Sequence, residues 1–102
     1  MVGYETVMVE IEVAAGTLVA PHTHPGIEST FVLEGGRQLH VDGQSPRTLG
    51  QGDAFQAPPN TVHFVQVGHR KARVCSTLVV RKGEPMTSPF TPPEKADVKP
   101  VT

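Results

Sequence analysis

The chain is divided into short runs in which apolar and polar residues alternate, and no segment spaces its apolar residues as an amphipathic helix would. In the first run, residues 7–13, three valines and an isoleucine take the odd positions, while a methionine and two glutamates take the even ones. A period of two places these two sets on opposite faces of a strand. Ten glycines and ten prolines separate the runs as turns. Many short strands joined by turns predict an all-β sandwich or barrel.

The rest of the chain continues this pattern as far as residue 83. Residues 29–34 and 37–41 predict two strands joined through Gly35 and Gly36. Further strands are expected within 47–58 on either side of a glycine turn, at 61–67 and at 72–81. We therefore predict one domain over residues 1–83.

The pattern stops at Glu84, and the segment 84–102 holds five of the ten prolines. We expect this segment to be a tail, either extended along the domain or a neighbouring subunit, or loose.

Composition excludes several classes of partner. The formal net charge is −1 and no run of Lys or Arg forms a stripe, so neither nucleic acid nor an anionic membrane is an expected partner. The first residues lack the charged and apolar regions of a signal peptide, and no apolar run is long enough to span a membrane. The expected location is cytoplasmic, or outside the cell if a leader has been removed. Cys75, the one cysteine, excludes an internal disulfide and is expected to be a small core residue.

The segment 21–26, PHTHPG, is the strongest indication of a functional site in the sequence. His22 and His24 are one residue apart, so in a strand they point to the same side, and Glu28 follows four residues later. Such a group is either an ordinary polar loop or one side of a metal site. A further histidine, His63, lies in the apolar run 61–67, where its ring nitrogens need partners. Three imidazoles and a carboxylate suit Fe(II), Mn(II), Ni(II) or Co(II), and Zn(II) or Cu(II) less selectively.

The spacing of these residues resembles the two motifs of the cupin superfamily. The first motif, G-x5-H-x-H-x3/4-E-x6-G, is matched at every fixed position by residues 16–35. The second, G-x5-P-x-G-x2-H-x3-N, is matched at Gly52, Pro58 and His63. Asn60 replaces its glycine and Val67 replaces its asparagine. Asparagine tolerates the left-handed conformation, so we expect the turn at Asn60 to survive.

The resemblance implies a single cupin-type jelly-roll β-barrel, also called a double-stranded β-helix, with His22, His24, Glu28 and His63 meeting inside its mouth. It also implies one divalent transition metal (Fe, Mn, Ni, Co, Cu or Zn) and a small-molecule substrate or ligand. The leading expectation is a metal-dependent oxygenase or dioxygenase, with isomerase or lyase chemistry next. The alternative is a non-catalytic module that binds a metal or a small ligand. Because the last strand is apolar at both parities and small cupins commonly pair, we expect a homodimer.

Three further residues are candidates for the pocket wall. Counted from Glu28 and from His63, Thr30 and Val65 share the parity of the expected ligands. Arg37 shares the parity of Leu39 and Val41 on the apolar face of its strand. It either anchors a substrate carboxylate at the barrel mouth or extends to solvent, and the second alternative is preferred from sequence.

Overall fold

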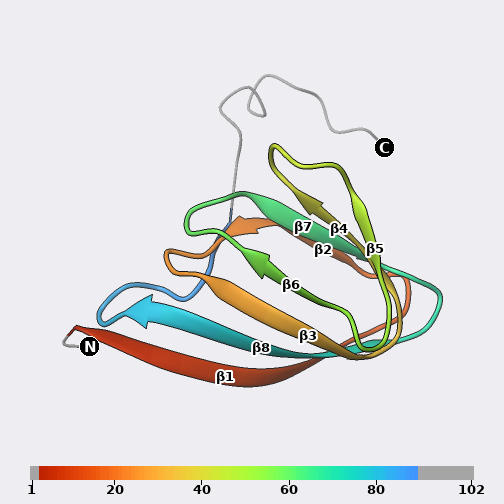
Figure 1. Ribbon diagram of the computed structural model, residues 1–102, viewed down its shortest axis with the longest axis horizontal. Coiled ribbons are helices and arrows are strands. Elements are labelled where there is room, and N and C mark those ends of the chain that lie inside the picture. Colours follow the sequence, from red (N-terminus) through yellow and green to blue (C-terminus); the bar gives the residue numbers. More distant parts are fainter. Residues whose placement is uncertain (1–2, 90–102) are drawn as a thin grey trace.

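The computed structural model describes residues 3–89, and within them all regular structure is β-strand, arranged in two antiparallel sheets (Figure 1). The first sheet has the order β1 (Tyr4–Val13), β8 (Ala72–Arg81), β3 (Glu28–Glu34) and β6 (Ala54–Ala57). The second has the order β5 (Arg47–Leu49), β4 (Arg37–Val41), β7 (His63–Val67), β2 (Leu18–Thr23) and β9 (Ser88–Pro89). The prediction of an all-β jelly-roll barrel is confirmed.

The core lies between the two sheets and follows the period of two along each strand. In β4 and β7 every second residue is buried, and in β8 burial alternates over nine positions. The main apolar cluster comprises Val32, Leu39, Val41, Leu49, Phe55, Val65, Val67, Ala72 and Val74. Burying a Val, Leu or Phe side chain stabilises the fold by about 1.5–3 kcal/mol, so a core without tryptophan can still hold a chain of this length. Val67, which replaces the motif's asparagine, belongs to this cluster.

Cys75 differs from its predicted place. It is half-buried and lies on the outer face of the first sheet, because the inward positions of β8 are the even ones. The sequence of this strand is apolar at both parities, so it does not determine which side faces inward.

The segment expected to be a tail contributes a strand to the barrel. Ser88 and Pro89 pair with Thr23 and His22 of β2. Residues 90–102, the remainder of the expected tail, lie outside the described residues.

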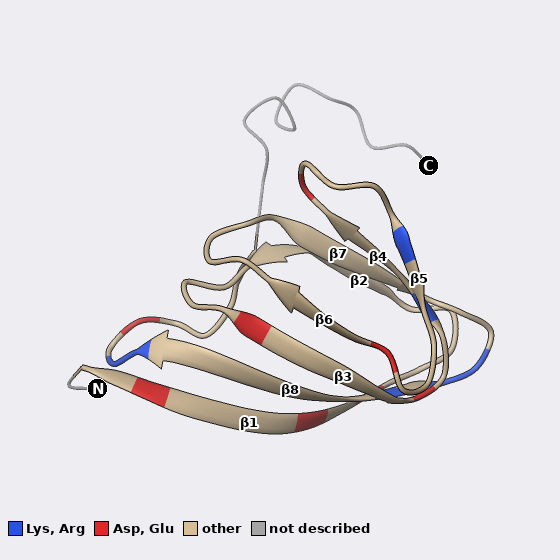
Figure 2. Ribbon diagram, viewed as in Figure 1, with Lys and Arg blue, Asp and Glu red and all other residues tan. Residues whose placement is uncertain are grey.

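Charged side chains occupy mainly β1, the strand ends and the turns, and Lys and Arg do not gather on one sheet (Figure 2). Within the described part of the chain, no helix is long and apolar enough to cross a membrane.

The loop between β2 and β3, which carries His24, is pressed against β8 at Gly26. A Cβ atom added there would lie 1.4 Å from the carbonyl oxygen of Val79, a backbone atom that cannot swing away. The amide of Val79 also donates to the carbonyl of Ile27, at 3.2 Å, which ties the loop to the strand. Only glycine therefore fits at position 26.

We expect the substitution Gly26→Ala to lower the free energy of unfolding by about 3 kcal/mol, because backbone must move to admit the methyl group. Gly50→Ala is the matched control, since a Cβ atom at Gly50 meets nothing within 4 Å. Chemical denaturation of both variants checks this. Equal stability of the two variants would contradict the close approach at Gly26.

Candidate metal centre

Two of the three clustered histidines come from neighbouring strands. His22 in β2 pairs directly with His63 in β7, and their ring centroids are 4.2 Å apart. A register shift between Val19 and His22 interrupts the pairing of β2 with β7. Such a bulge re-aims the side chains that follow it. Val19 and His22, three residues apart, can for this reason both line the interior.

His24 lies just beyond the end of β2 and is fixed by a turn of the second motif. The amide of Asn60 donates to the carbonyl of His24 at 2.7 Å. Asn60 has φ of 54°, so the asparagine that replaces the motif's glycine adopts the left-handed conformation expected of it. The two motifs are thus joined by a backbone hydrogen bond at the site itself.

Backbone carbonyls fix the tautomer of all three histidines. Nδ1 of His22 donates to the carbonyl of Ala20 at 2.7 Å, and Nδ1 of His63 donates to that of Thr61 at 3.0 Å. Nδ1 of His24 donates to the carbonyl of Met86 at 2.9 Å. A carbonyl oxygen can only accept, so each Nδ1 carries the proton. Each neutral imidazole then presents the lone pair of Nε2, which is how metal-binding histidines are commonly oriented.

One oxygen of the Glu28 carboxylate faces two of these rings, and the other accepts hydrogen bonds from two hydroxyl groups. Its Oε1 is 3.0 Å from Nε2 of His63 and 3.1 Å from Nε2 of His24. Its Oε2 accepts hydrogen bonds from the hydroxyl of Thr30, at 2.7 Å, and from that of Ser76, at 3.4 Å. Thr30 and Ser76 also bond to each other at 2.8 Å. One carboxylate oxygen is therefore anchored to the sheet and the other faces the imidazoles.

This arrangement fits a bound cation. The ligand atoms of His22, His24 and His63 lie within 4.8 Å of one another. The buried Nε2 of His24 has no hydrogen-bond partner among the described residues. Nε2 of His24 can meet the Glu28 oxygen at this distance in two ways, either as the donor of a doubly protonated ring or as a lone pair with a metal ion between the two atoms. Adjacent donors around an octahedral ion with bonds of about 2.1 Å are also about 3 Å apart.

The pKa values of these groups shift in a way that reflects the same need for positive charge. Burial alone would raise the pKa of Glu28, but the imidazoles of His24 and His63 and the hydroxyl of Thr30 outweigh it and hold that pKa well below its usual range. Burial lowers the pKa of His22. Burial also acts to lower the pKa of His24, but the nearby Glu28 carboxylate and the Met86 carbonyl raise it above its usual value.

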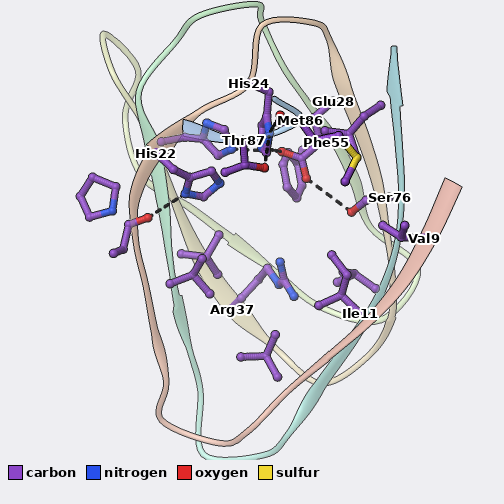
Figure 3. A pocket seen from close by; sticks show the side chains of 18 of the residues that line it. Val9, Ile11, His22, His24, Glu28, Arg37, Phe55, Ser76, Met86 and Thr87 are labelled. Carbon is purple, nitrogen blue, oxygen red and sulfur yellow. Dashed lines mark hydrogen bonds and ion pairs between the residues drawn. The ribbon is translucent and has the colours of Figure 1, made fainter. Parts of the chain in front are cut away.

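The cluster lines a cavity of about 450 Å³ between the sheets (Figure 3). Most of the remaining wall is apolar and is formed by Val9, Ile11, Val13, Val19, Phe55, Val65, Val74 and Leu78. Such a volume suits a small organic molecule. An apolar wall also limits water around an ion, which strengthens electrostatic interactions inside.

The residues predicted to line the pocket occupy different places. Val65 lines the cavity. Thr30 does not line it, because its hydroxyl is directed to the Glu28 carboxylate instead. The preferred alternative for Arg37, extension to solvent, is wrong: the side chain is 7% exposed and lines the cavity. Its strand is covered by β5 and β7 on either side, so no frayed edge gives it a route out.

Sequence reasoning missed three residues of the site. Ser76 follows the inward parity of Val74 and Leu78 in β8, a signal that could have identified it. Met86 and Thr87 approach Nδ1 of His24 from 62 and 63 residues further along the chain. No local pattern indicates such a contact.

Comparison with known proteins gives one family and several similar structures. The family model described as Cupin domain matches residues 9–81. An RmlC-like cupin from Shewanella frigidimarina NCIMB 400 is 25% identical, with a TM-score of 0.69, over 78% of this chain and 69% of that chain. The polyketide cyclase RemF from Streptomyces resistomycificus is 22% identical, with a TM-score of 0.70, over 90% of this chain and 66% of that chain. No curated protein matches the sequence.

The DMSP lyase DddQ from Ruegeria pomeroyi DSS-3 is 24% identical, with a TM-score of 0.76, over 83% of this chain. The match spans only 43% of that lyase. At these identities the similar structures establish the fold. The family model covers strands from both sheets together with all four residues of the histidine–glutamate cluster, and the chain belongs to the cupin superfamily.

Proposed function

We propose that this cupin is a metal-dependent enzyme that acts on a small organic substrate, with an oxygenase-type reaction as the leading candidate. Three imidazoles fixed as Nε2 donors around one carboxylate, at the wall of an apolar cavity, support this proposal. His22, His24, Glu28 and His63 would hold one divalent ion of Fe, Mn, Ni, Co, Cu or Zn. When bound, such an ion supplies open coordination positions for a substrate and dioxygen, or polarises a substrate oxygen.

The remaining groups in the cavity favour an oxygenase over an isomerase or a lyase. Among the described residues that line it, the four candidate ligands and Arg37 are the only titratable side chains. Isomerisation and elimination need a proton acceptor beside the ion, and the hydroxyls of Ser76 and Thr87 are poor bases. A reaction with dioxygen needs no such group. Isomerase and lyase chemistry therefore stand second. The similarity in fold to the lyase DddQ keeps a lyase reaction among the candidates.

Hydrogen bonds with neighbouring residues would orient the metal ligands. Thr30 and Ser76 orient the Glu28 carboxylate, and the carbonyls of Ala20, Thr61 and Met86 orient the rings. Partners of this kind fix a ligand's direction and raise its basicity.

The alternative remains a non-catalytic module that binds a metal or a small ligand. Oxygen consumption by the iron-loaded protein with a panel of small organic acids and enols separates it from an oxygenase.

We expect the protein purified without chelators or an affinity tag to contain close to one equivalent of a transition metal, and His63→Ala to lose it, because a buried donor is removed. His40→Ala is the matched control. His40 is in β4 and stacks on Phe64 with ring centroids 4.3 Å apart, away from the cluster. Elemental analysis of all three proteins checks this. A parent protein that stays metal-free after reconstitution under reducing conditions would overturn the metalloenzyme.

Metal affinity should fall as the pH is lowered, because the imidazoles must be neutral to bind. The raised pKa of His24 means that a proton competes with the metal already above the usual histidine value of 6.5. The lowered pKa of His22 leaves that ring neutral to lower pH. Titration with Co(II) should show an apparent Kd that rises about tenfold per pH unit below pH 7. A flat profile between pH 8 and about 5.5 would contradict histidine ligation.

We also propose that the protein forms a homodimer through the outer face of the first sheet. Met8 is 70% exposed and Phe31 is 46% exposed. Met8 is paired with Thr77, and Phe31 with Cys75, so they lie on the same face of β1 and β3, the two strands that flank β8. Large apolar side chains exposed together on a sheet are typical of an interface.

In that case Phe31→Glu should convert the dimer to a monomer in size-exclusion chromatography with light scattering, because a charge is placed in an apolar contact. Leu18→Glu is the control, since Leu18 is 55% exposed but lies in β2 of the other sheet. A parent protein that is monomeric at micromolar concentration would argue against this interface.

A further inference from the structure

The guanidinium of Arg37 is buried in the cavity without a partner. The residue is 7% exposed, and its Nε and Nη2 atoms are both buried and lack a hydrogen-bond acceptor among the described residues. In Figure 3 the side chain extends into the cavity, on the side away from His24 and Glu28. An unpaired buried charge is costly, and native proteins keep one only where something pairs with it.

Packing does not require an arginine at this position. Arg37 occupies the same face of β4 as Leu39 and Val41, and it is paired in register with Leu49 and Val67. All four of these neighbours are buried apolar residues. A valine or leucine would continue the core here, so the charge serves a purpose other than packing.

The cavity offers Arg37 no free anion of its own. Glu28 is the one carboxylate among the described lining residues; its Oε1 faces Nε2 of His24 and His63, and its Oε2 accepts from Thr30 and Ser76. Burial lowers the pKa of Arg37, and the charge of Glu28 only partly opposes this. Arginine nevertheless remains charged in proteins. The positive charge is therefore available to an occupant of the cavity.

The arginine and the histidine cluster lie at two different levels of the barrel. Arg37 is paired with Val67, while Val41 is paired with His63, so the two levels are four residues apart along β4 and β7. At about 3.3 Å per residue the backbone positions are separated by roughly 13 Å, and the long arginine side chain bridges part of this distance. Val65, which is paired with Leu39, lies between the two levels and lines the cavity.

We propose that the cavity takes a small carboxylic acid, whose carboxylate forms a two-point ion pair with Arg37 and whose other end lies against the histidine–glutamate cluster. The planar fork of an arginine matches the two oxygens of a carboxylate. A carboxylate is favoured over a phosphate dianion because Arg37 is the one permanently cationic side chain among the described lining residues. Only the role of the second end rests on the proposed metal centre. The pairing with Arg37 does not.

The test measures binding by calorimetry, with benzoate and butyrate as probes and the neutral benzamide and butyramide as their matched controls. The parent protein should bind each acid at least about tenfold more tightly than its amide, because only the acid gives a charge-assisted pair. Arg37→Met, which keeps length but removes charge, should lose this preference. Arg37→Lys should restore part of it, since the charge returns without the fork. Arg70→Met, at an exposed turn residue, should behave as the parent.

Several results would overturn the proposal. These are equal binding of acid and amide by the parent, no binding of either acid at millimolar concentration, and unchanged acid binding by Arg37→Met. Tighter binding of phenylphosphonate than of benzoate would reassign the pocket to phosphate-like anions. If Arg37→Met fails to fold, the acid–amide comparison is made on the chelator-treated parent, where Arg37 is the one remaining source of the acid preference, and on Arg37→Lys.

Metal content measured in the same samples separates this inference from the proposed function. A metal-free parent that still prefers acids through Arg37 would refute the metal centre alone. A metal-loaded parent that is indifferent to the carboxylate would refute the Arg37 site alone.

Discussion

The hydrogen bonds from three imidazole Nδ1 atoms to backbone carbonyls are the constraint on which the rest of the site depends. Two of these carbonyls, those of Ala20 and Thr61, lie two residues before their histidines, so the strand itself orients each ring. The third, that of Met86, comes from the segment that leads into β9. With every Nδ1 proton committed to a carbonyl, the three Nε2 lone pairs are left to face a common point. The barrel thereby fixes the chemical form of the histidines as well as their positions.

A second consequence concerns Glu28, which would otherwise be a carboxylate buried among apolar residues. The hydroxyls of Thr30 and Ser76, from β3 and β8, donate hydrogen bonds to one of its oxygens. These bonds hold the carboxylate in an orientation in which the other oxygen faces His24 and His63. The same contacts explain why its pKa is held low in spite of burial. An ionised carboxylate together with neutral imidazoles is the protonation state in which these side chains can bind a divalent ion. Because Thr30 and Ser76 occupy inward-facing positions of β3 and β8, the alternation of side chains along these two strands helps to keep Glu28 ionised.

The sequence is sufficient to predict those features that depend on local periodicity and motif spacing. The alternation along β1, β4 and β7 indicates the fold class, and the motif spacing of His22, His24, Glu28 and His63 indicates that these four side chains meet. The features that the sequence does not predict depend on contacts between distant segments. The Met86 carbonyl reaches His24 across 62 residues. The burial of Arg37 depends on the strands that cover β4, and the side of β8 on which Cys75 lies is ambiguous because both faces of that strand carry apolar residues.

The electrostatics of the cavity connect the two ends of the site. Neutral imidazoles and one carboxylate leave a net charge of about +1 on a bound divalent ion, and Arg37 adds another positive charge at the far end of an apolar space. With the proposed ion bound, a cavity with two positive ends and a wall of valine and leucine would repel cations and give neutral polar molecules no compensation for the water they lose. An organic anion with a short apolar body matches both ends and the wall. The same field would raise the concentration of such anions near the barrel mouth, so binding and selection of the substrate follow from one distribution of charge.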